Sequence, residues 1–483
     1  MQSAALLIDD ALAPASDGGT FDRHDPVLRS VATRASAASV KDALRAANAA
    51  ARAFPAWSQT SPSERRACLN RAADLLLARQ DDVTDAMISE TGATRGWAGF
   101  NCALAASMLR EAAAMTTQIS GEVIPADTPG SIAFAMRQPC GVVFSMAPWN
   151  APVILATRSV AMPLACGNTV VLKASELSPR THGIVGEVLS QAGMPKGTIN
   201  VIHTRPEAAP EVVEALIAHH AVRRVNFTGS TRVGRIIAEN AARHLKPCLL
   251  ELGGKAPLIV LDDADVDRAV AAAVFGAFFH QGQICMSTER LIVDETIADE
   301  FVEKFVARAA AIRAMDPRDP DCVVGAMITE SAAQRVKGLI DDALAKGAVL
   351  RAGGRQEGVF LDPAVVDRVG PGMRIYEEEC FGPVATIMRV SGDDEAISIA
   401  NDTDYGLAAA VHSRDVARAL GVARRLETGI CHINGATIQD EPQMPFGGVK
   451  ASGYGRFGGK AGIEAFTELR WITIETGAAH YPI

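Results

Sequence analysis

Short β-branched runs alternate with helical stretches from residue 141 onward, and this alternation constrains the fold of the 483-residue chain most strongly. A helix is predicted over 179–191, because Gly193 and Pro195 form a common stop signal beyond it. The alternation indicates parallel strands joined by crossover helices, the doubly wound α/β plan in which ligands bind beyond the carboxyl ends of strands. The β-branched runs lie at 141–144, 169–172, 198–202 and 224–227.

A second α/β region is predicted downstream of the first. A β-prone run at 258–261 is followed by a helix-rich stretch over 265–315 and by a strand near 384–387. Near the C-terminus, 471–474 is also β-prone. A terminal strand of this kind either pairs with a partner subunit or closes a sheet of its own chain, and the sequence leaves both alternatives open.

The first hundred residues carry mainly helical signals. Ser61 and Glu64 have the spacing of a capping box, with a proline in the first turn between them, so a helix is expected to begin there. At 483 residues the chain exceeds what one hydrophobic core usually supports, and two or three domains are expected.

Composition narrows the function classes. Hydrophobic residues at 48% and charged residues at 21% are typical of a globular protein. The net charge of −9 disfavours nucleic acid and anionic membrane as partners, and polar interruptions of the apolar stretch 153–172 disfavour a membrane span. Nine cysteines without a Cys-x-x-Cys pair suggest neither a zinc site nor a disulfide scaffold. We therefore expect a cytoplasmic protein, without a signal peptide, that binds a small molecule and no metal.

The candidate catalytic residues are a cysteine, a glutamate and an asparagine. Cys285 follows a Gln-Gly-Gln-Ile run, and Glu251 opens a Glu-Leu-Gly-Gly-Lys segment 34 residues before it. A thiolate attacks carbonyl carbons and a carboxylate can act as its base. Asn150 follows the run at 141–144 and could donate to a developing oxyanion. Each also has a plain structural interpretation, since most cysteines are small buried hydrophobic residues and asparagine is common in turns.

Two further segments predict a nucleotide site. Gly229, Ser230 and Gly234 lie in a strand-to-helix turn, where free N–H groups attract phosphate, although an ordinary turn explains them equally well. Lys173 and Glu176 follow the run at 169–172, where a carboxylate can accept from both ribose hydroxyls and would repel a 2′-phosphate. This pair favours NAD over NADP, and a solvated surface ion pair is its structural alternative.

Taken together, these segments resemble the aldehyde dehydrogenase superfamily, in its order and across nearly the whole chain. Segment 251–255 resembles the glutamate signature of the family, and 281–285 resembles its cysteine signature. Within the family the chain looks most like bacterial salicylaldehyde dehydrogenases, through 97–101, 285–290 and 454–457. Enzymes for vanillin and benzaldehyde remain close.

The resemblance implies a role for each motif residue. Cys285 would be the nucleophile and Glu251 the general base, while Asn150 and the Cys285 N–H would form the oxyanion hole. Lys173 and Glu176 would hold the adenosine ribose of NAD, Ser230 the pyrophosphate, and Glu379 the nicotinamide ribose. Ala174 replaces a proline that many relatives have, which affects backbone stiffness more than chemistry. The full set of expected cofactor residues is Trp149, Lys173, Glu176, Gly229, Ser230, Gly234, Leu252, Glu379 and Phe381.

The resemblance also implies three structural parts and a homodimer or homotetramer. The expected parts are a doubly wound dinucleotide-binding domain over 1–117 and 140–250, an α/β catalytic domain over 251–465, and a small β oligomerisation element over 118–139 and 466–483.

The expected reaction is NAD-dependent oxidation of a small aromatic aldehyde, such as salicylaldehyde, through a thiohemiacetal and a thioester. Arg158 either meets a polar substituent on the ring or forms a structural ion pair. Alternatives are vanillin, benzaldehyde or an aliphatic semialdehyde as substrate, an acylating enzyme that uses coenzyme A, which Glu251 argues against, and a non-catalytic binding protein on the same fold. The expected substrate-pocket residues are Trp97, Phe100, Arg158, Ile284, Met286 and Phe446.

Overall fold

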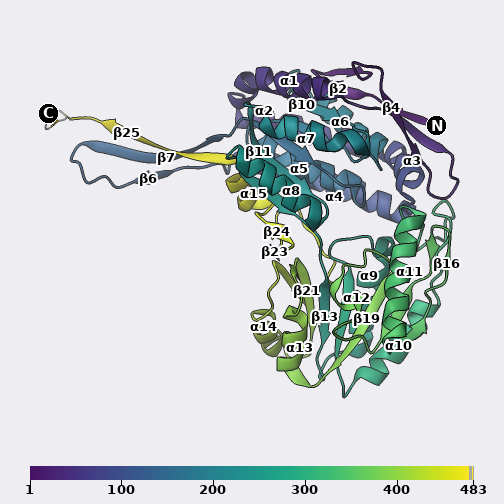
Figure 1. The fold of residues 1–483 in the computed structure, drawn as a ribbon. Coiled ribbons are helices and arrows are strands. Elements are labelled where there is room, and N and C mark those ends of the chain that lie inside the picture. The colour runs from purple at the N-terminus through teal and green to yellow at the C-terminus, as the bar shows by residue number, and fades with distance from the viewer. Residues whose placement is uncertain (478–480, 482) are drawn as a thin grey trace.

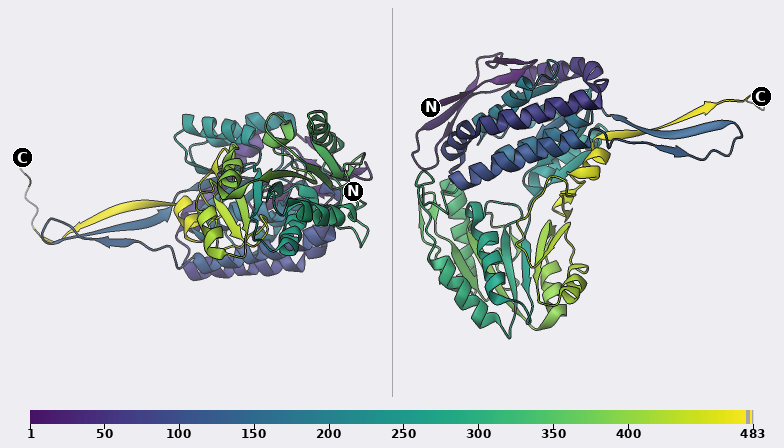
Figure 2. Two further views of the ribbon diagram at one scale, coloured as in Figure 1. Left: turned by 90° about the horizontal axis from the view of Figure 1, so that it is seen from below. Right: turned by 180° about the vertical axis from the view of Figure 1, so that it is seen from behind.

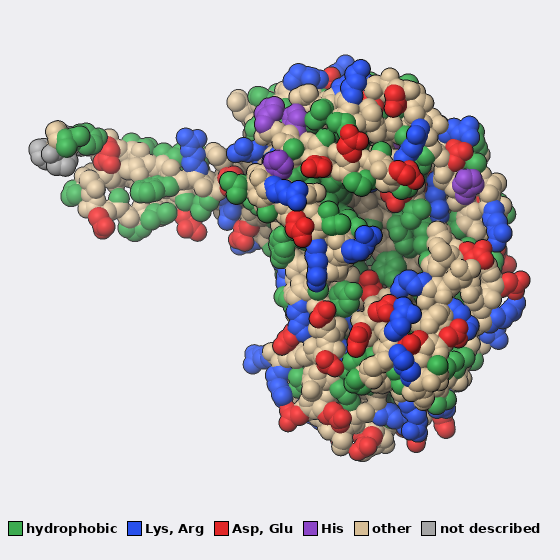
Figure 3. Space-filling model, viewed as in Figure 1, with side chains coloured by type: hydrophobic (Ala, Val, Ile, Leu, Met, Phe, Trp, Pro, Cys, Tyr) green, Lys and Arg blue, Asp and Glu red, His purple; other side chains and the backbone are tan. Residues whose placement is uncertain are grey.

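The computed structural model describes residues 1–477, 481 and 483 of the chain. Two lobes lie one above the other, and a long β arm projects sideways from the upper lobe (Figures 1 and 2). The space-filling view shows a hollow between the lobes in which hydrophobic side chains gather (Figure 3). Among the described residues, no helix is long and apolar enough to cross a membrane.

The upper lobe is built on an eight-stranded sheet in the order β24-β12-β11-β8-β9-β10-β2-β3. Its five central strands are parallel, so the predicted doubly wound α/β fold is confirmed. All four predicted β-branched runs are strands of this sheet, and their apolar residues are buried on both faces. The strands are β2 (Leu6–Ile8), β3 (Ala11–Ala13), β8 (Val142–Met146), β9 (Thr169–Lys173), β10 (Ile199–Ile202), β11 (Val222–Thr228), β12 (Cys248–Glu251) and β24 (Gly453–Tyr454).

The helices of the upper lobe begin and end close to their sequence signals. Ser61 caps α2: its hydroxyl accepts from the Glu64 N–H, and the Glu64 carboxylate accepts from the Ser61 N–H, so the predicted capping box is confirmed. Helix α6 has the bounds predicted for it. The expectation of a mainly helical N-terminus is wrong for its first 36 residues, which form strands of three to six residues that are too short for periodicity to reveal. The helices are α1 (Val40–Ser58), α2 (Pro62–Ala78), α3 (Gln80–Thr91), α4 (Arg95–Met115), α5 (Pro152–Ala165), α6 (Pro179–Gln191), α7 (Ala209–Ala218) and α8 (Thr231–Arg243), and the further N-terminal strands are β1 (Gln2–Ala4), β4 (Thr20–His24) and β5 (Val31–Ser36).

The lower lobe holds a seven-stranded sheet in the order β15-β18-β19-β14-β13-β21-β22, of which only β15 is antiparallel. The stretch over 265–315 that was expected to be helix-rich holds two α-helices, and β14, which the sequence analysis did not predict, lies between them. The strands are β13 (Ala256–Val260), β14 (Thr288–Asp294), β15 (Val349–Ala352), β18 (Ala364–Asp367), β19 (Val384–Val390), β21 (Ala408–His412) and β22 (Ile430–Ile433). The helices are α9 (Val266–Phe278), α10 (Ala298–Ala310), α11 (Glu330–Ala345), α12 (Arg374–Glu377), α13 (Gly392–Asn401) and α14 (Val416–Ala423).

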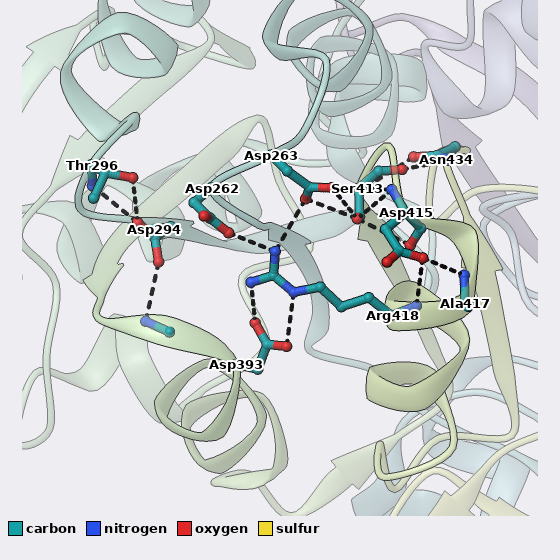
Figure 4. A network of polar contacts seen from close by, with 11 residues as sticks. Asp262, Asp263, Asp294, Thr296, Asp393, Ser413, Asp415, Ala417, Arg418 and Asn434 are labelled. Carbon is teal, nitrogen blue, oxygen red and sulfur yellow. Dashed lines mark hydrogen bonds and ion pairs between the residues drawn. The ribbon is translucent and has the colours of Figure 1, made fainter.

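An ion-pair network closes the end of this sheet that lies away from the upper lobe (Figure 4). The guanidinium of Arg418, on α14, lies 2.7 Å from a carboxylate oxygen of Asp262, 3.4 Å from one of Asp263 and 2.6 Å from one of Asp393. The hydroxyl of Ser413 donates to both oxygens of Asp263 at 2.8 Å. The network therefore ties the segment after β13 to the segment after β21 and to α13.

The arm consists of β6 (Glu122–Ile124), β7 (Ser131–Pro139) and β25 (Thr467–Glu475). The C-terminal strand β25 pairs antiparallel with β7 along its whole length, so it belongs to a sheet of its own chain. It is an edge strand of that sheet, and its pairing with a partner subunit stays a prediction. Large apolar side chains on the arm are exposed, with Val123 at 82% and Trp471 at 76%. Residues 478–480 and 482 of the expected oligomerisation element lie outside the described residues. The remaining elements are β16 (Gln356–Glu357), β17 (Phe360–Leu361), β20 (Tyr405–Gly406), β23 (Val449–Lys450) and α15 (Gly459–Ala465).

Candidate active site

Cys285 lies where two cavities meet. One cavity, of about 480 Å³, is also lined by Ser230, Glu379 and Phe381, and the other, of about 250 Å³, by aromatic side chains. A third cavity of about 660 Å³ contains Lys173 and Glu176, and it shares Trp149 and the turn at 228–230 with the first. All the expected cofactor residues except Gly234 therefore line one connected region, and Cys285 stands between this region and the aromatic cavity.

The backbone before Cys285 has an unusual left-handed turn. His280 has a φ of 49°, Gln281 of 56° and Gly282 of 66°. At Gly282 a Cβ atom would come within 2.1 Å of the Gly382 carbonyl oxygen, so this position also requires a glycine for space. Two of the three residues are not glycine, and strained backbone of this kind is concentrated at functional sites.

The Cys285 thiol is a weak acid in this structure. Burial raises its pKa to about 12, and the negative charges of Glu251 and Glu379 act in the same direction. The positive charge of Arg158 opposes them. Formation of the reactive thiolate therefore depends on nearby charges and on pH.

Glu251 ends β12 and is 3% exposed. Both of its carboxylate oxygens are buried and accept no hydrogen bond from any described residue. Burial raises the pKa of Glu251 well above its ordinary value, against the lowering effect of Arg158 and Arg456. A buried carboxyl group without a hydrogen-bond partner costs stability, and a raised pKa makes it a candidate functional group.

The side chain of Asn150 is held in place between the two cavities that meet at Cys285. Its amide nitrogen donates to the Gln283 backbone carbonyl at 2.9 Å, and the backbone carbonyl of Asn150 accepts from the Trp97 indole at 2.9 Å. The amide nitrogen carries two hydrogens, and only one is needed for the bond to Gln283. The other can donate to an oxygen atom bound next to Cys285.

The expected nucleotide residues fit a dinucleotide. Ser230 is the N-cap of α8, and its hydroxyl accepts from the Val233 N–H at 3.4 Å, so the positive end of this helix faces the cavity. Lys173 and Glu176 are 3.8 Å apart and line its far part. Gly234 has a packing role, because a Cβ atom there would come within 2.4 Å of Leu252.

Glu379 and Phe381 line the cavity of about 480 Å³ that Cys285 also lines, which is called the cofactor cavity below after its expected ligand. The Glu379 carboxylate accepts from the Gly254 N–H at 2.8 Å. Burial raises the pKa of Glu379 to about 7, and the charge of Glu289 adds to this effect. Phe381 has a φ of 50°, and its ring meets that of Trp149 edge to face at 5.9 Å.

All six expected substrate-pocket residues line the aromatic cavity. Trp97 stacks on Phe100 with centroids 5.5 Å apart, and two further rings that the sequence interpretation missed, Phe275 and Phe279, stack at 4.8 Å. Phe275 lies on α9 and Phe279 directly follows the helix, and this spacing of four residues, which places side chains on one side of a helix, could have revealed them. The cavity is therefore shaped and lined for a flat, apolar ring.

Arg158 forms a buried ion pair in the wall of this cavity. Its guanidinium donates to Asp440, and both side chains are less than 10% exposed. The guanidinium carbon also lies 4.0 Å from the centre of the Phe446 ring. Of the two alternatives considered for Arg158, the ion pair is present, and its partner Asp440 was missed because it is 282 residues away in the chain.

The comparison with known proteins matches the aldehyde dehydrogenase family model to residues 13–472. The chain is 59% identical to the vanillin dehydrogenase of Pseudomonas fluorescens, with 100% of both chains covered. It is 50% identical to the salicylaldehyde dehydrogenase of Pseudomonas putida, with 99% of each covered. The crystal structure of a salicylaldehyde dehydrogenase from Pseudomonas putida G7 complexed with salicylaldehyde has a TM-score of 0.98 and 49% identity, with 100% of both chains covered.

The chain belongs to the aldehyde dehydrogenase family and is an enzyme. The predicted resemblance to this family is thereby confirmed. Members of the family use NAD or NADP as hydride acceptor.

Proposed function

We propose that this enzyme oxidises hydroxylated benzaldehydes to the corresponding carboxylic acids, with NAD as the hydride acceptor. One observation carries the proposal: Cys285 lines both the aromatic cavity and the cavity that contains the expected cofactor residues. A nucleophile at this junction can hold the aldehyde carbon next to a nicotinamide ring.

The chemistry follows from the positions of three side chains. The Cys285 thiolate adds to the aldehyde carbon, and the oxyanion of the thiohemiacetal accepts from the Asn150 amide and the Cys285 N–H. A nicotinamide bound in the neighbouring cavity would supply the acceptor for the hydride of this carbon. Glu251 then takes a proton from the water that attacks the thioester. Its raised pKa makes it a stronger base for this step.

The choice of NAD rests on Glu176. Its carboxylate lines the cavity beside Lys173, where it can accept from both hydroxyls of the adenosine ribose. A 2′-phosphate at the same place would face its negative charge. We therefore infer a preference for NAD over NADP.

For the substrate, we infer an aromatic ring with a hydroxyl substituent. The aromatic rings of the cavity suit a benzaldehyde, and Asp440 and Arg158 provide an acceptor and a donor in its wall. Vanillin and salicylaldehyde, the aldehydes for which two relatives are named, both have a hydroxylated ring. The chain has the higher identity to the vanillin dehydrogenase. Vanillin thus stands beside salicylaldehyde as a candidate.

We further propose a cytoplasmic homodimer or homotetramer that assembles through the arm. The exposed apolar side chains of β6, β7 and β25 support assembly through the arm. The nine cysteines are free thiols, which supports a reducing cytoplasm. We also propose the three parts predicted from the sequence. Residues 1–117 and 140–250 bind the dinucleotide, 251–465 carry out catalysis, and 118–139 and 466–483 form the subunit contact.

The test is the appearance of NADH or NADPH absorbance with vanillin, salicylaldehyde, benzaldehyde and a short aliphatic aldehyde, with each cofactor in parallel. We expect turnover of the hydroxylated rings with NAD, and none with the Cys285→Ala variant. Turnover of the aliphatic aldehyde alone would refute the substrate class. If a thioester accumulates and only coenzyme A releases it, the enzyme transfers the acyl group to coenzyme A and does not form the free acid.

A further inference from the structure

A fully buried ion pair lies beside the candidate active site. The Lys255 ammonium lies 2.6 Å from the Glu289 carboxylate, and the side chains are 0% and 4% exposed. Each residue stands four positions after a candidate catalytic residue, Lys255 after Glu251 and Glu289 after Cys285. None of the roles proposed above uses this pair.

Both members of the pair bind the segment that carries Glu379 and Phe381. The Glu289 carboxylate accepts from the Cys380 N–H at 2.8 and 2.9 Å and from the Phe381 N–H at 3.0 Å. The Lys255 ammonium donates to the Glu378 carbonyl at 2.7 Å and to the Cys380 sulfur at 3.3 Å. The pair therefore holds the backbone on both sides of Glu379.

The sheet topology explains why these groups meet. Strand β14 lies between β13 and β19, and all three are parallel, so they begin at the same edge of the sheet. Lys255 directly precedes β13, Glu289 is the second residue of β14, and 378–381 precede β19. The ion pair thus joins the Glu251 segment, the Cys285 segment and the Glu379 segment at one point.

The held segment is one that would not keep its shape alone. Phe381 has a left-handed φ of 50°, a conformation that costs free energy in a residue with a side chain. The Glu289 carboxylate, which accepts from the N–H groups of Phe381 and Cys380, compensates for that cost. The result fixes the Glu379 carboxylate and the Phe381 ring at the end of the cofactor cavity.

We propose that Lys255 and Glu289 are positioning residues for the cofactor, which hold Glu379 and Phe381 in the geometry that binds the nicotinamide end of NAD. The proposal rests on the proposed function, since it takes NAD as the ligand of this cavity. It predicts that loss of the pair weakens NAD binding while the chemistry of the Cys285 thiol persists.

The test uses two variants and a matched control. Glu289→Gln keeps an oxygen acceptor but loses the charge, and the double variant Lys255→Met with Glu289→Leu removes both charges and all acceptors without leaving one charge buried and unpaired. The control is Asp294→Asn, which alters another buried carboxylate at the opposite end of β14, where it accepts from Thr296 and Gly392 (Figure 4).

Three quantities are measured: the dissociation constant of NAD from tryptophan fluorescence, cofactor-independent hydrolysis of p-nitrophenyl acetate, and the melting temperature. We expect NAD binding to weaken about tenfold or more in the double variant and less in Glu289→Gln, with ester hydrolysis within about twofold of the unaltered enzyme. Asp294→Asn should lower the melting temperature and leave NAD binding unchanged.

Unchanged NAD binding in the folded double variant overturns the proposal. A parallel loss of ester hydrolysis and NAD binding in Glu289→Gln also overturns it, because the pair would then support the whole site. Failure of the proposed function gives a separate result, namely no NAD binding and no aldehyde oxidation by the unaltered enzyme.

Discussion

Gly254 separates the Glu251 segment from the Cys285 backbone, and its replacement by alanine gives a sharp test of the site geometry. A Cβ atom at this position would come within 2.1 Å of the Cys285 carbonyl oxygen. Real Cβ contacts are almost never shorter than 3.0 Å, so the two segments must separate by about 0.9 Å. No flexible side chain can absorb this shift, because the atom met is backbone.

A displacement of about 1 Å in a reacting group typically lowers the rate by about a hundredfold. We expect Gly254→Ala to lose that factor in kcat/KM for aldehyde oxidation, which corresponds to about 2.7 kcal/mol of transition-state stabilisation. Initial rates of NADH formation across a range of aldehyde concentrations measure it, and circular dichroism verifies folding.

The matched control is Gly338→Ala in α11. No atom lies within 4 Å of a Cβ built there, so the change should leave kcat/KM unaltered and raise stability by up to about 1 kcal/mol. If Gly254→Ala is folded and retains full kcat/KM, then contact between the Glu251 and Cys285 segments does not set the reactive geometry.

Further outcomes are expected elsewhere in the molecule. Glu251→Gln should give a burst of NADH stoichiometric with enzyme followed by very slow turnover, and steady turnover from the start in stopped-flow traces would exclude it as the base. Asp440→Asn should move the pH–rate profile toward lower pH and Arg158→Met toward higher pH, because their charges respectively raise and lower the pKa of Cys285; shifts of the same sign would contradict this. Trp471→Glu should reduce the mass found by light scattering, whereas an unchanged mass would place the interface away from the arm. Arg418→Met should lower the free energy of unfolding in urea by about 2 kcal/mol without altering kcat, and unchanged stability would show that its ion pairs are energetically neutral.

The sequence predicted those features that local patterns carry. The strands β8 to β11 contain the short β-branched runs, and α6 is bounded by helix signals, so their positions follow from a few neighbouring residues. The candidate site residues likewise lie in contiguous motifs, and the structure brings Glu379 near Cys285 although 94 residues separate them. Their catalytic and binding roles stay predictions that the variants above test.

Features that depend on distant contacts could not be predicted. The partner of Arg158 is 282 residues away, and nothing near Asp440 marks it as buried. Strand β14 begins with Thr288, Glu289 and Arg290, whose polarity conceals a fully buried strand. Glu289 is tolerated there only because Lys255 and backbone N–H groups meet it after folding.

The carboxyl group of Glu251, which accepts no hydrogen bond from any described residue, makes the stability of the enzyme depend on pH. Because its pKa is raised in the folded protein, the folded state favours the protonated form, so its contribution to stability is present below the ordinary value of 4.5 and is lost as pH rises through the raised value. Burial also raises the pKa of Cys285, from 9.0 to about 12, so its contribution to stability is likewise lost as pH rises through this range. Alkaline pH that supplies more thiolate therefore also weakens the fold, and the pH of fastest turnover should lie above the pH at which the enzyme survives longest.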